Sequence, residues 1–252
     1  MKTSVKVVLT VIGIHFTVSV TWAQVHDAFG DTLGHGAFRK EMGQTANTDG
    51  EVVTGITHYS EGSPIKLWLH DDASVTYSMA TDDTIYSVLQ QFTGEDYNAG
   101  SDLVEGIQTE DHANYYKPWD RVEEVPAYKS IRRNNVFTDI DVLYYFGRSG
   151  PKMALILQPG SSPTSIQIQY TGQDSLGVDL AGMLALYQGE YQIRLNEAYA
   201  YQVDESYDII AVGWTPYYAV DGNSGIVSFE FDTYDTNLPL IFQIGPPPLG
   251  GG

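Results

Sequence analysis

The 252-residue sequence predicts an all-β protein built as an antiparallel β-sandwich. Apolar and polar residues alternate along short segments, most clearly over residues 165–170 and 226–232. This period-2 pattern places one face of a strand on a core and the other in water. Glycine, proline and aspartate recur between such segments, and helical periodicity is hard to find. Short alternating strands with regularly spaced turns are typical of a sandwich.

Individual strands follow from the same pattern, taken in chain order. We expect a strand over 128–133, a polar turn at Asn134 and Asn135, and a second strand over 136–146. The continuously apolar run 153–157 reads as an inner strand. The three segments 176–180, 183–187 and 191–195 are separated by glycine-containing turns, which predicts a meander.

The amino terminus predicts export. Lys2 and Lys6 precede an apolar run over 7–20, and Thr21-Trp22-Ala23 places small residues before a cut ahead of Gln24. The alternative is a membrane anchor, but the run is shorter than the roughly 20 apolar residues of a spanning helix. We therefore expect residues 1–23 to be a signal peptide, with no membrane span in the mature form.

The remaining chain divides by composition into three parts. Residues 24–37 are expected to form an amino-terminal extension, and 38–244 the all-β domain, as one unit or as two lobes over about 38–125 and 126–244. Residues 245–252 are glycine and proline only, apart from Leu249, and are expected to be a linker or a truncated end.

Charge and cysteine content exclude several functions. The chain has 13 basic and 32 acidic residues, a net charge of −19, and no cysteine. Such a charge repels polyanions, so nucleic-acid binding is not expected. Without cysteine there is no thiol catalysis and no thiolate metal site. The acidic turns predict weak calcium binding at most.

Two aspartates form the strongest catalytic candidate. Asp139 and Asp141 are two residues apart and would share a face of a strand, while a retaining glycosidase needs two carboxyl groups about 5–5.5 Å apart. Catalytic pairs usually flank a substrate from different strands, so we favour a structural role in a turn.

The histidines do not predict a metal site. Metal-binding histidines on one strand or helix need a spacing that places them on one face. The five histidines that follow the signal peptide lack this spacing: His26, His35, His58, His70 and His112. His70-Asp71-Asp72 could bind a cation, but we favour the interpretation that it is an acidic turn. The segment 221–225 fails the calcium-loop and serine-protease patterns and is expected to be a hairpin loop.

Tyrosine is unusually frequent, with 18 in the chain and adjacent pairs at Tyr115-Tyr116, Tyr144-Tyr145 and Tyr217-Tyr218. Adjacent strand residues point to opposite faces, so one tyrosine of each pair is expected in the core and the other in solvent. An exposed tyrosine can stack on a sugar ring. Aromatic residues are also simply good strand formers, and we favour that explanation.

Several segments resemble a known family, the domain that precedes SBBP-type β-propeller repeats in secreted bacterial proteins. They include residues 38–44, 111–119, 128–147, 158–166 and 200–202, and the similarity spans about residues 38–242. The residues that match the family's motifs are Gly43, Gln44, Asn114, Tyr115, Trp119, Tyr128, Ile140, Asp141, Tyr144, Tyr145, Pro159, Gly160 and Tyr201. The resemblance implies a strand pair within 65–79, a strand over 87–94 and structural roles for these residues. Thr138-Asp139 replaces the family's Pro-Gly, which predicts a looser turn before Ile140.

Together these observations predict a secreted or cell-surface, non-catalytic structural or adhesive β module. We expect no catalytic, cofactor or metal site, and partners among extracellular surface components or glycans. Two alternatives stay open: a carbohydrate-binding module, which needs exposed aromatic residues with polar neighbours, and a glycoside hydrolase, which needs two convergent carboxylates in a cleft.

Overall fold

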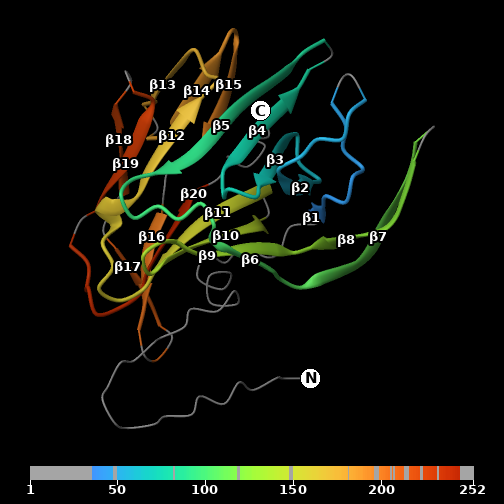
Figure 1. Cartoon of the computed structure of the whole chain (residues 1–252). Coiled ribbons are helices and arrows are strands. Elements are labelled where there is room, and N and C mark those ends of the chain that lie inside the picture. The colour runs from blue at the N-terminus through green and yellow to red at the C-terminus, as the bar shows by residue number, and fades with distance from the viewer. Residues whose placement is uncertain are drawn as a thin grey trace.

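The structure, a computed structural model, describes residues 36–244 except 48–49, 82, 118–119, 148–149, 181, 196–198, 205, 207, 213–215, 222–223 and 232. The predicted signal peptide, the extension before Gly36, Trp119 and the segment 245–252 lie outside the described residues. The described chain is all-β, with three antiparallel sheets in a sandwich-like arrangement, so the predicted fold class is confirmed (Figure 1). Within this part of the chain, no helix is long and apolar enough to cross a membrane.

The largest sheet has ten strands in the order β18-β19-β12-β5-β4-β3-β2-β1-β8-β7. Strands from both sides of residue 125 share it, because β12 pairs with β5. The outermost pair, β7 and β8, projects from the sheet as a long ribbon (Figure 1). The strands are β1 (Ala37–Lys40), β2 (Ile56–Glu61), β3 (Ile65–His70), β4 (Val75–Ala80), β5 (Ile85–Thr93), β7 (Gln108–Lys117), β8 (Asp120–Tyr128), β12 (Gln167–Thr171), β18 (Pro216–Asp221) and β19 (Ile226–Phe231).

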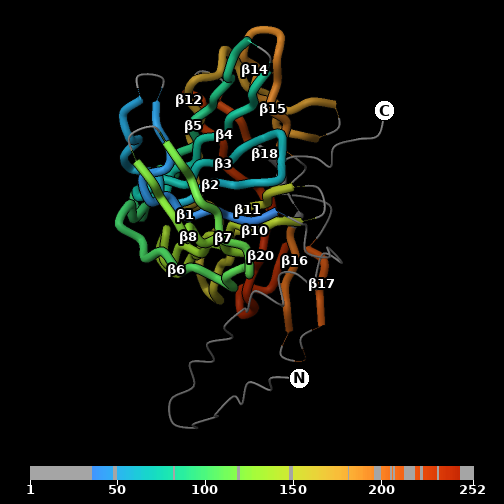
Figure 2. Tube along the Cα trace, turned by 90° about the vertical axis from the view of Figure 1, so that its right-hand side faces the viewer, coloured from blue at the N-terminus to red at the C-terminus, as the bar shows by residue number. Residues whose placement is uncertain are grey.

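The second sheet has seven strands in the order β17-β16-β20-β11-β10-β9-β6, and the third is the meander β13-β14-β15. In both views the seven-stranded sheet lies below β3, β4, β5 and β12 of the ten-stranded sheet and level with β1, β7 and β8 (Figures 1 and 2). A short 3-10 helix, η1 (Pro163–Ser165), precedes β12. The strands are β6 (Asp102–Glu105), β9 (Ser130–Phe137), β10 (Ile140–Gly147), β11 (Gly150–Leu157), β13 (Ser175–Val178), β14 (Leu184–Gln188), β15 (Tyr191–Leu195), β16 (Tyr199–Val203), β17 (Ile209–Ala211) and β20 (Leu240–Ile244).

One core joins the three sheets. Leu67 and Tyr77 come from the ten-stranded sheet, Val142 and Tyr144 from the seven-stranded sheet, and Leu186 from the meander. A second buried cluster lies on the opposite face of the seven-stranded sheet and contains Leu143, Tyr145, Ala154, Ile156, Tyr201, Val203 and Ile241. All eight residues of β10 are therefore buried. This explains why its sequence, apart from Asp141, is apolar or aromatic and does not alternate.

The hairpin of β9 and β10 differs from the sequence prediction. Strand β9 runs through Asn134 and Asn135, and the turn is at Thr138-Asp139, so the predicted turn position is wrong. Asn135 has a φ of 53°, a left-handed conformation that asparagine tolerates, and it forms an irregularity in the strand pairing. Phe137 pairs directly with Ile140, so the turn is a tight two-residue turn rather than a loose one. Asp139, with a φ of 58°, takes the place of the glycine.

The other predicted strands are found close to their expected positions. The inner strand is β11, the pair within 65–79 is β3 and β4, and the meander is β13 to β15. Ile168, Tyr170, Val227 and Phe229 are buried, as the alternation predicts.

Candidate functional site

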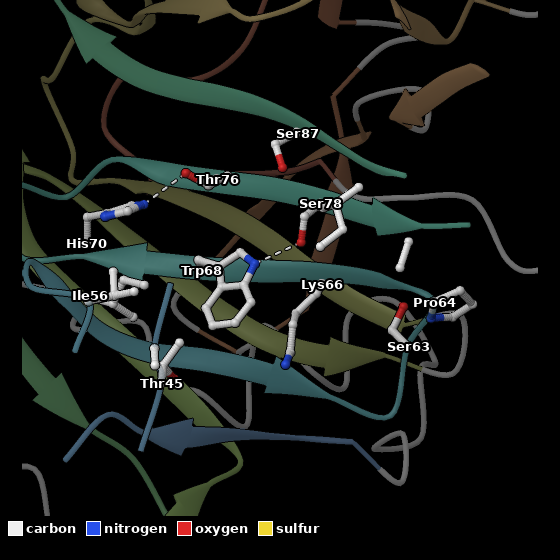
Figure 3. A pocket seen from close by; sticks show the side chains of 14 residues that line it. Thr45, Ile56, Ser63, Pro64, Lys66, Trp68, His70, Thr76, Ser78 and Ser87 are labelled. Atoms are coloured by element: carbon white, nitrogen blue, oxygen red, sulfur yellow. Dashed lines mark hydrogen bonds between the residues drawn. The ribbon is translucent and has the colours of Figure 1, made fainter. Parts of the chain in front are cut away.

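A groove crosses the outer face of the ten-stranded sheet, the face turned away from the core. Its volume is about 550 Å³, and its floor is made by β3, β4 and the start of β5 (Figure 3). Thr45, Ala46 and Val53 line one side. We call it the Trp68 groove, after the largest side chain that lines it.

The strand pleat determines which side chains reach the groove. Leu67 and Leu69 of β3 are buried in the core, so the alternating Lys66, Trp68 and His70 point outward. In β4, Val75 and Tyr77 are buried, whereas Thr76, Ser78 and Ala80 line the groove. The pairing of Trp68 with Thr76 and of Lys66 with Ser78 brings these residues side by side.

Two hydrogen bonds fix the floor of the groove. The indole Nε1 of Trp68 donates to Ser78 Oγ at 2.7 Å, and His70 Nε2 lies 2.9 Å from Thr76 Oγ1. The indole nitrogen is thereby satisfied inside the protein, and Figure 3 shows the ring across the strands, seen face-on. Burial lowers the pKa of His70, against the opposing effect of Asp72 and Asp71.

Lys66 lies against two aromatic rings. Its Nζ is 4.5 Å from the ring centroid of Tyr59 and 4.4 Å from that of Trp68, and the two centroids are 5.3 Å apart. An ammonium over aromatic faces is attracted by their quadrupoles. Burial lowers the pKa of Lys66, while Glu61 and Glu41 act in the opposite direction. The cation is thus partly enclosed and partly balanced by neighbouring carboxylates.

A polar network supports the groove from the side of β1, β2 and β7. The hydroxyls of Tyr59 and Tyr115 are 2.8 Å apart, and Gln44 Nε2 donates to Tyr59 Oη at 3.4 Å. Tyr115 Oη donates to Glu61 at 3.3 Å, and Arg39 donates twice to Glu61, at 3.0 and 2.7 Å. Burial raises the pKa of Tyr59.

The loop after β1 forms the wall beside this network. Gln44 Nε2 also donates to the carbonyl of Lys40 at 2.5 Å, while its Oε1 accepts from the backbone of Met42 at 2.7 Å. Gly43 has a φ of 100°, which a residue with a side chain rarely adopts, and its carbonyl accepts from Lys117 at 3.1 Å. The motif residues Gly43, Gln44 and Tyr115, distant in sequence, therefore meet beside the groove.

Asp139 and Asp141 lie elsewhere. Asp141 forms an ion pair with Arg132, and its Oδ1 accepts from the backbone of Asn135 at 2.7 Å. Asp139 is exposed in the turn and not in the strand, so the predicted shared strand face is wrong. Neither residue lines the Trp68 groove.

The remaining motif residues that the structure describes are placed in the core, in a turn and on β7. Tyr128, Ile140, Tyr144, Tyr145 and Tyr201 are buried. Gly160, with a φ of 86°, follows Pro159 in a turn and donates to the carbonyl of Thr236 at 2.8 Å. Asn114 Oδ1 accepts from the backbone of Glu124 at 2.8 Å, which joins β7 to β8.

The tyrosine pairs follow the prediction only in part. Tyr116 is 66% exposed and Tyr115 is partly buried. Tyr144 and Tyr145 do point to opposite faces, but both are buried, because both faces of β10 are covered. The expectation that one of them is exposed is wrong. Tyr217 and Tyr218 lie in β18, but their side chains are outside the described part of the structure.

The histidines are spread over the fold: His58 is buried, His70 lines the groove and His112 is exposed, whereas His26 and His35 lie outside the described residues. Among the residues that the structure places, no three acids or histidines are grouped to hold a metal ion. In the predicted hairpin loop, Ser224 Oγ donates to Asp221 at 2.7 Å.

Sequence reasoning missed the Trp68 groove. The available signal was the alternation in residues 65–70, Ile-Lys-Leu-Trp-Leu-His, which gives Lys66, Trp68 and His70 one common face. The pattern does not tell whether that face is open or covered by a second sheet.

Fold and site thus define a β-sandwich with an open groove on an outer sheet face. The chain belongs to the family described as "Domain of unknown function (DUF7948)", whose model matches residues 50–243. Neither a curated protein nor a solved structure matches this chain.

Proposed function

We propose that this protein is an exported, non-catalytic adhesive module that binds a glycan in the Trp68 groove. The observation that carries the proposal is the chemistry of the lining. The Trp68 ring and the hydroxyl-bearing side chains of Thr45, Ser63, Thr76, Ser78 and Ser87 line the same groove. Sugars present apolar ring faces and many hydroxyls, so an aromatic ring whose hydrogen-bonding neighbours, apart from Lys66 and His70, are hydroxyl groups suits them.

The same lining argues against hydrolysis as the alternative. None of the 14 residues that line the groove is an aspartate or a glutamate. Glycosidases generally need two carboxyl groups at the scissile bond. Asp141 is engaged with Arg132 and Asn135, away from the groove.

Replacement of Trp68 tests the proposal. Trp68→Ala should weaken binding to any glycan that the protein retains on a glycan array roughly tenfold or more, because the stacking surface is lost. Titration calorimetry on the best array ligand gives the affinity, and circular dichroism checks the fold. Tyr116→Ala removes a more exposed aromatic residue on β7, outside the groove, and should bind like the wild type. Equal affinity of all three proteins, or release of reducing ends from the bound glycan, would contradict the proposal.

Export is part of the proposal and rests on the amino-terminal sequence. The resemblance to the domain ahead of SBBP-type repeats supports an extracellular or cell-surface location. We expect material recovered outside the cell to begin at Gln24. Intact-mass measurement settles this, since secreted protein that retains Met1 would show that residues 1–23 are not a cleaved signal.

A further inference from the structure

We infer that the ligand is a linear, uncharged polysaccharide and that its binding surface continues from the Trp68 groove over the outer faces of β5 and β12. This inference rests on the proposed glycan binding and specifies the ligand further. We call the added surface the β5–β12 strip and define it by the outward residues Leu89, Gln91, Thr93, Gln167 and Gln169.

The strip is continuous with the groove. Ser78, in the groove floor, pairs with Ser87 of β5, and Ser87 lines the groove too. Two residues further along β5, Leu89 follows on the same face, and then Gln91, which pairs with Gln169 of β12. Their neighbours Val88, Gln90 and Ile168 are buried, which shows that the named side chains point away from the core.

Polar groups on this surface are available for a ligand. Ser87 Oγ and the side-chain amides of Gln91 and Gln167 have no hydrogen-bond partner among the described residues. Gln169 donates a long bond of 3.4 Å to the carbonyl of Ser224, and its Oε1 accepts none from the described chain. Amides and hydroxyls both donate and accept, so they match the hydroxyl groups of a sugar.

Charge narrows the ligand class. The chain carries 32 acidic residues, yet the outward positions of β3, β4, β5 and β12 hold no aspartate or glutamate. Acidic side chains are found on the strands that flank these four, at Glu61 of β2 and Glu230 of β19. A cationic polymer would therefore find no partner along the groove and strip.

An anionic polymer is disfavoured as well. Lys66 and His70 are the basic residues at these outward positions, and Lys66 is partly balanced by Glu61 and Glu41. The net charge of −19 repels a polyanion at longer range. With cationic and anionic polymers disfavoured, the surface favours an uncharged polysaccharide.

The length of the surface favours a chain of several sugars over a single sugar. Neighbouring strands are about 4.8 Å apart, so the path from Trp68 on β3 across β4 and β5 to Gln169 on β12 is roughly 15 Å long. We expect a disaccharide to occupy the groove alone and a hexasaccharide to cover the strip as well. Affinity should therefore increase with chain length.

Titration calorimetry with cello-, manno-, xylo- and laminari-oligosaccharides tests this, from disaccharide to hexasaccharide, with carboxymethylcellulose as the anionic probe. At least one hexasaccharide should bind roughly tenfold tighter than its disaccharide. Gln91→Ala should remove most of that gain and leave disaccharide binding unchanged, since only the strip is altered. Gln108→Ala, the same substitution on β7 at the far edge of the sheet, should behave like the wild type.

The outcomes separate the two proposals. Disaccharide and hexasaccharide binding of equal strength, or no effect of Gln91→Ala, would exclude the strip and leave the groove intact. Preference for carboxymethylcellulose over every neutral probe would overturn the uncharged ligand but not glycan binding. Binding that is unaffected by Trp68→Ala would refute the groove itself.

Discussion

Leu143→Ala should lower the free energy of unfolding by about 2–5 kcal/mol, the usual loss when a buried leucine is truncated. Leu143 is 3% exposed and lies in the second buried cluster, with Ala154, Ile156 and Ile241 of the neighbouring strands. Truncation leaves a cavity in the middle of the seven-stranded sheet, where β10 is paired on both sides. The melting temperature should fall by several degrees for a domain of this size.

Leu180 offers a matched control for this substitution. Its side chain is fully exposed, so Leu180→Ala removes the same atoms without a cavity and should change the stability by less than about 0.5 kcal/mol. Denaturant unfolding of both variants, with unchanged m-values, gives the comparison. A loss at Leu143 as small as that at Leu180 would mean that this face of the sheet contributes little to the folded state.

The same sheet shows how far sequence reasoning reaches. The continuous apolar run 153–157 identified β11, because burial on both faces removes the need for polar alternation, and β-branched and aromatic residues identified β10. The turn was misplaced because Asn134-Asn135 has ordinary turn composition, whereas Asp141, six residues further on, accepts the hydrogen bond of Asn135 and keeps it in the strand. That contact depends on strand pairing and is invisible in a local pattern.

The groove illustrates a second limit. The pattern of β3 predicts which residues share a face, but not that the sheets stack on the side of Leu67 and Leu69 and leave Trp68 open. The family motifs indicated which residues support the fold, but they did not indicate which side chains line the groove. Gln44 and Tyr115 do not themselves line the groove; they hold its side wall through Tyr59.

A buried histidine joins the two large sheets. His58 of β2 is 2% exposed, and its Nε2 lies 3.3 Å from Oε1 of Glu105 on β6, which also pairs with Lys40 of β1 at 2.8 Å. Burial lowers the pKa of His58 to about 4; Glu105 opposes this effect, and Lys40 and Arg133 add to it. The ring is therefore neutral in the folded protein at pH 7.

The stability of the fold should decrease on acidification because of this residue. Its pKa is about 4 when folded and 6.5 in the unfolded chain, so the unfolded state binds more protons between these values. Above pH 6.5 the free energy of unfolding contains the full contribution of the neutral ring. This contribution, about 3 kcal/mol in total, is lost as the pH falls towards 4.

His58→Gln removes the titrating ring, so its unfolding free energy should change less over this pH range than that of the wild type. His112→Gln, an exposed histidine on β7, should follow the wild-type curve. Urea unfolding at pH 4 to 7 measures all three, and parallel curves for wild type and His58→Gln would show that protonation of this histidine is not what weakens the contact between the sheets.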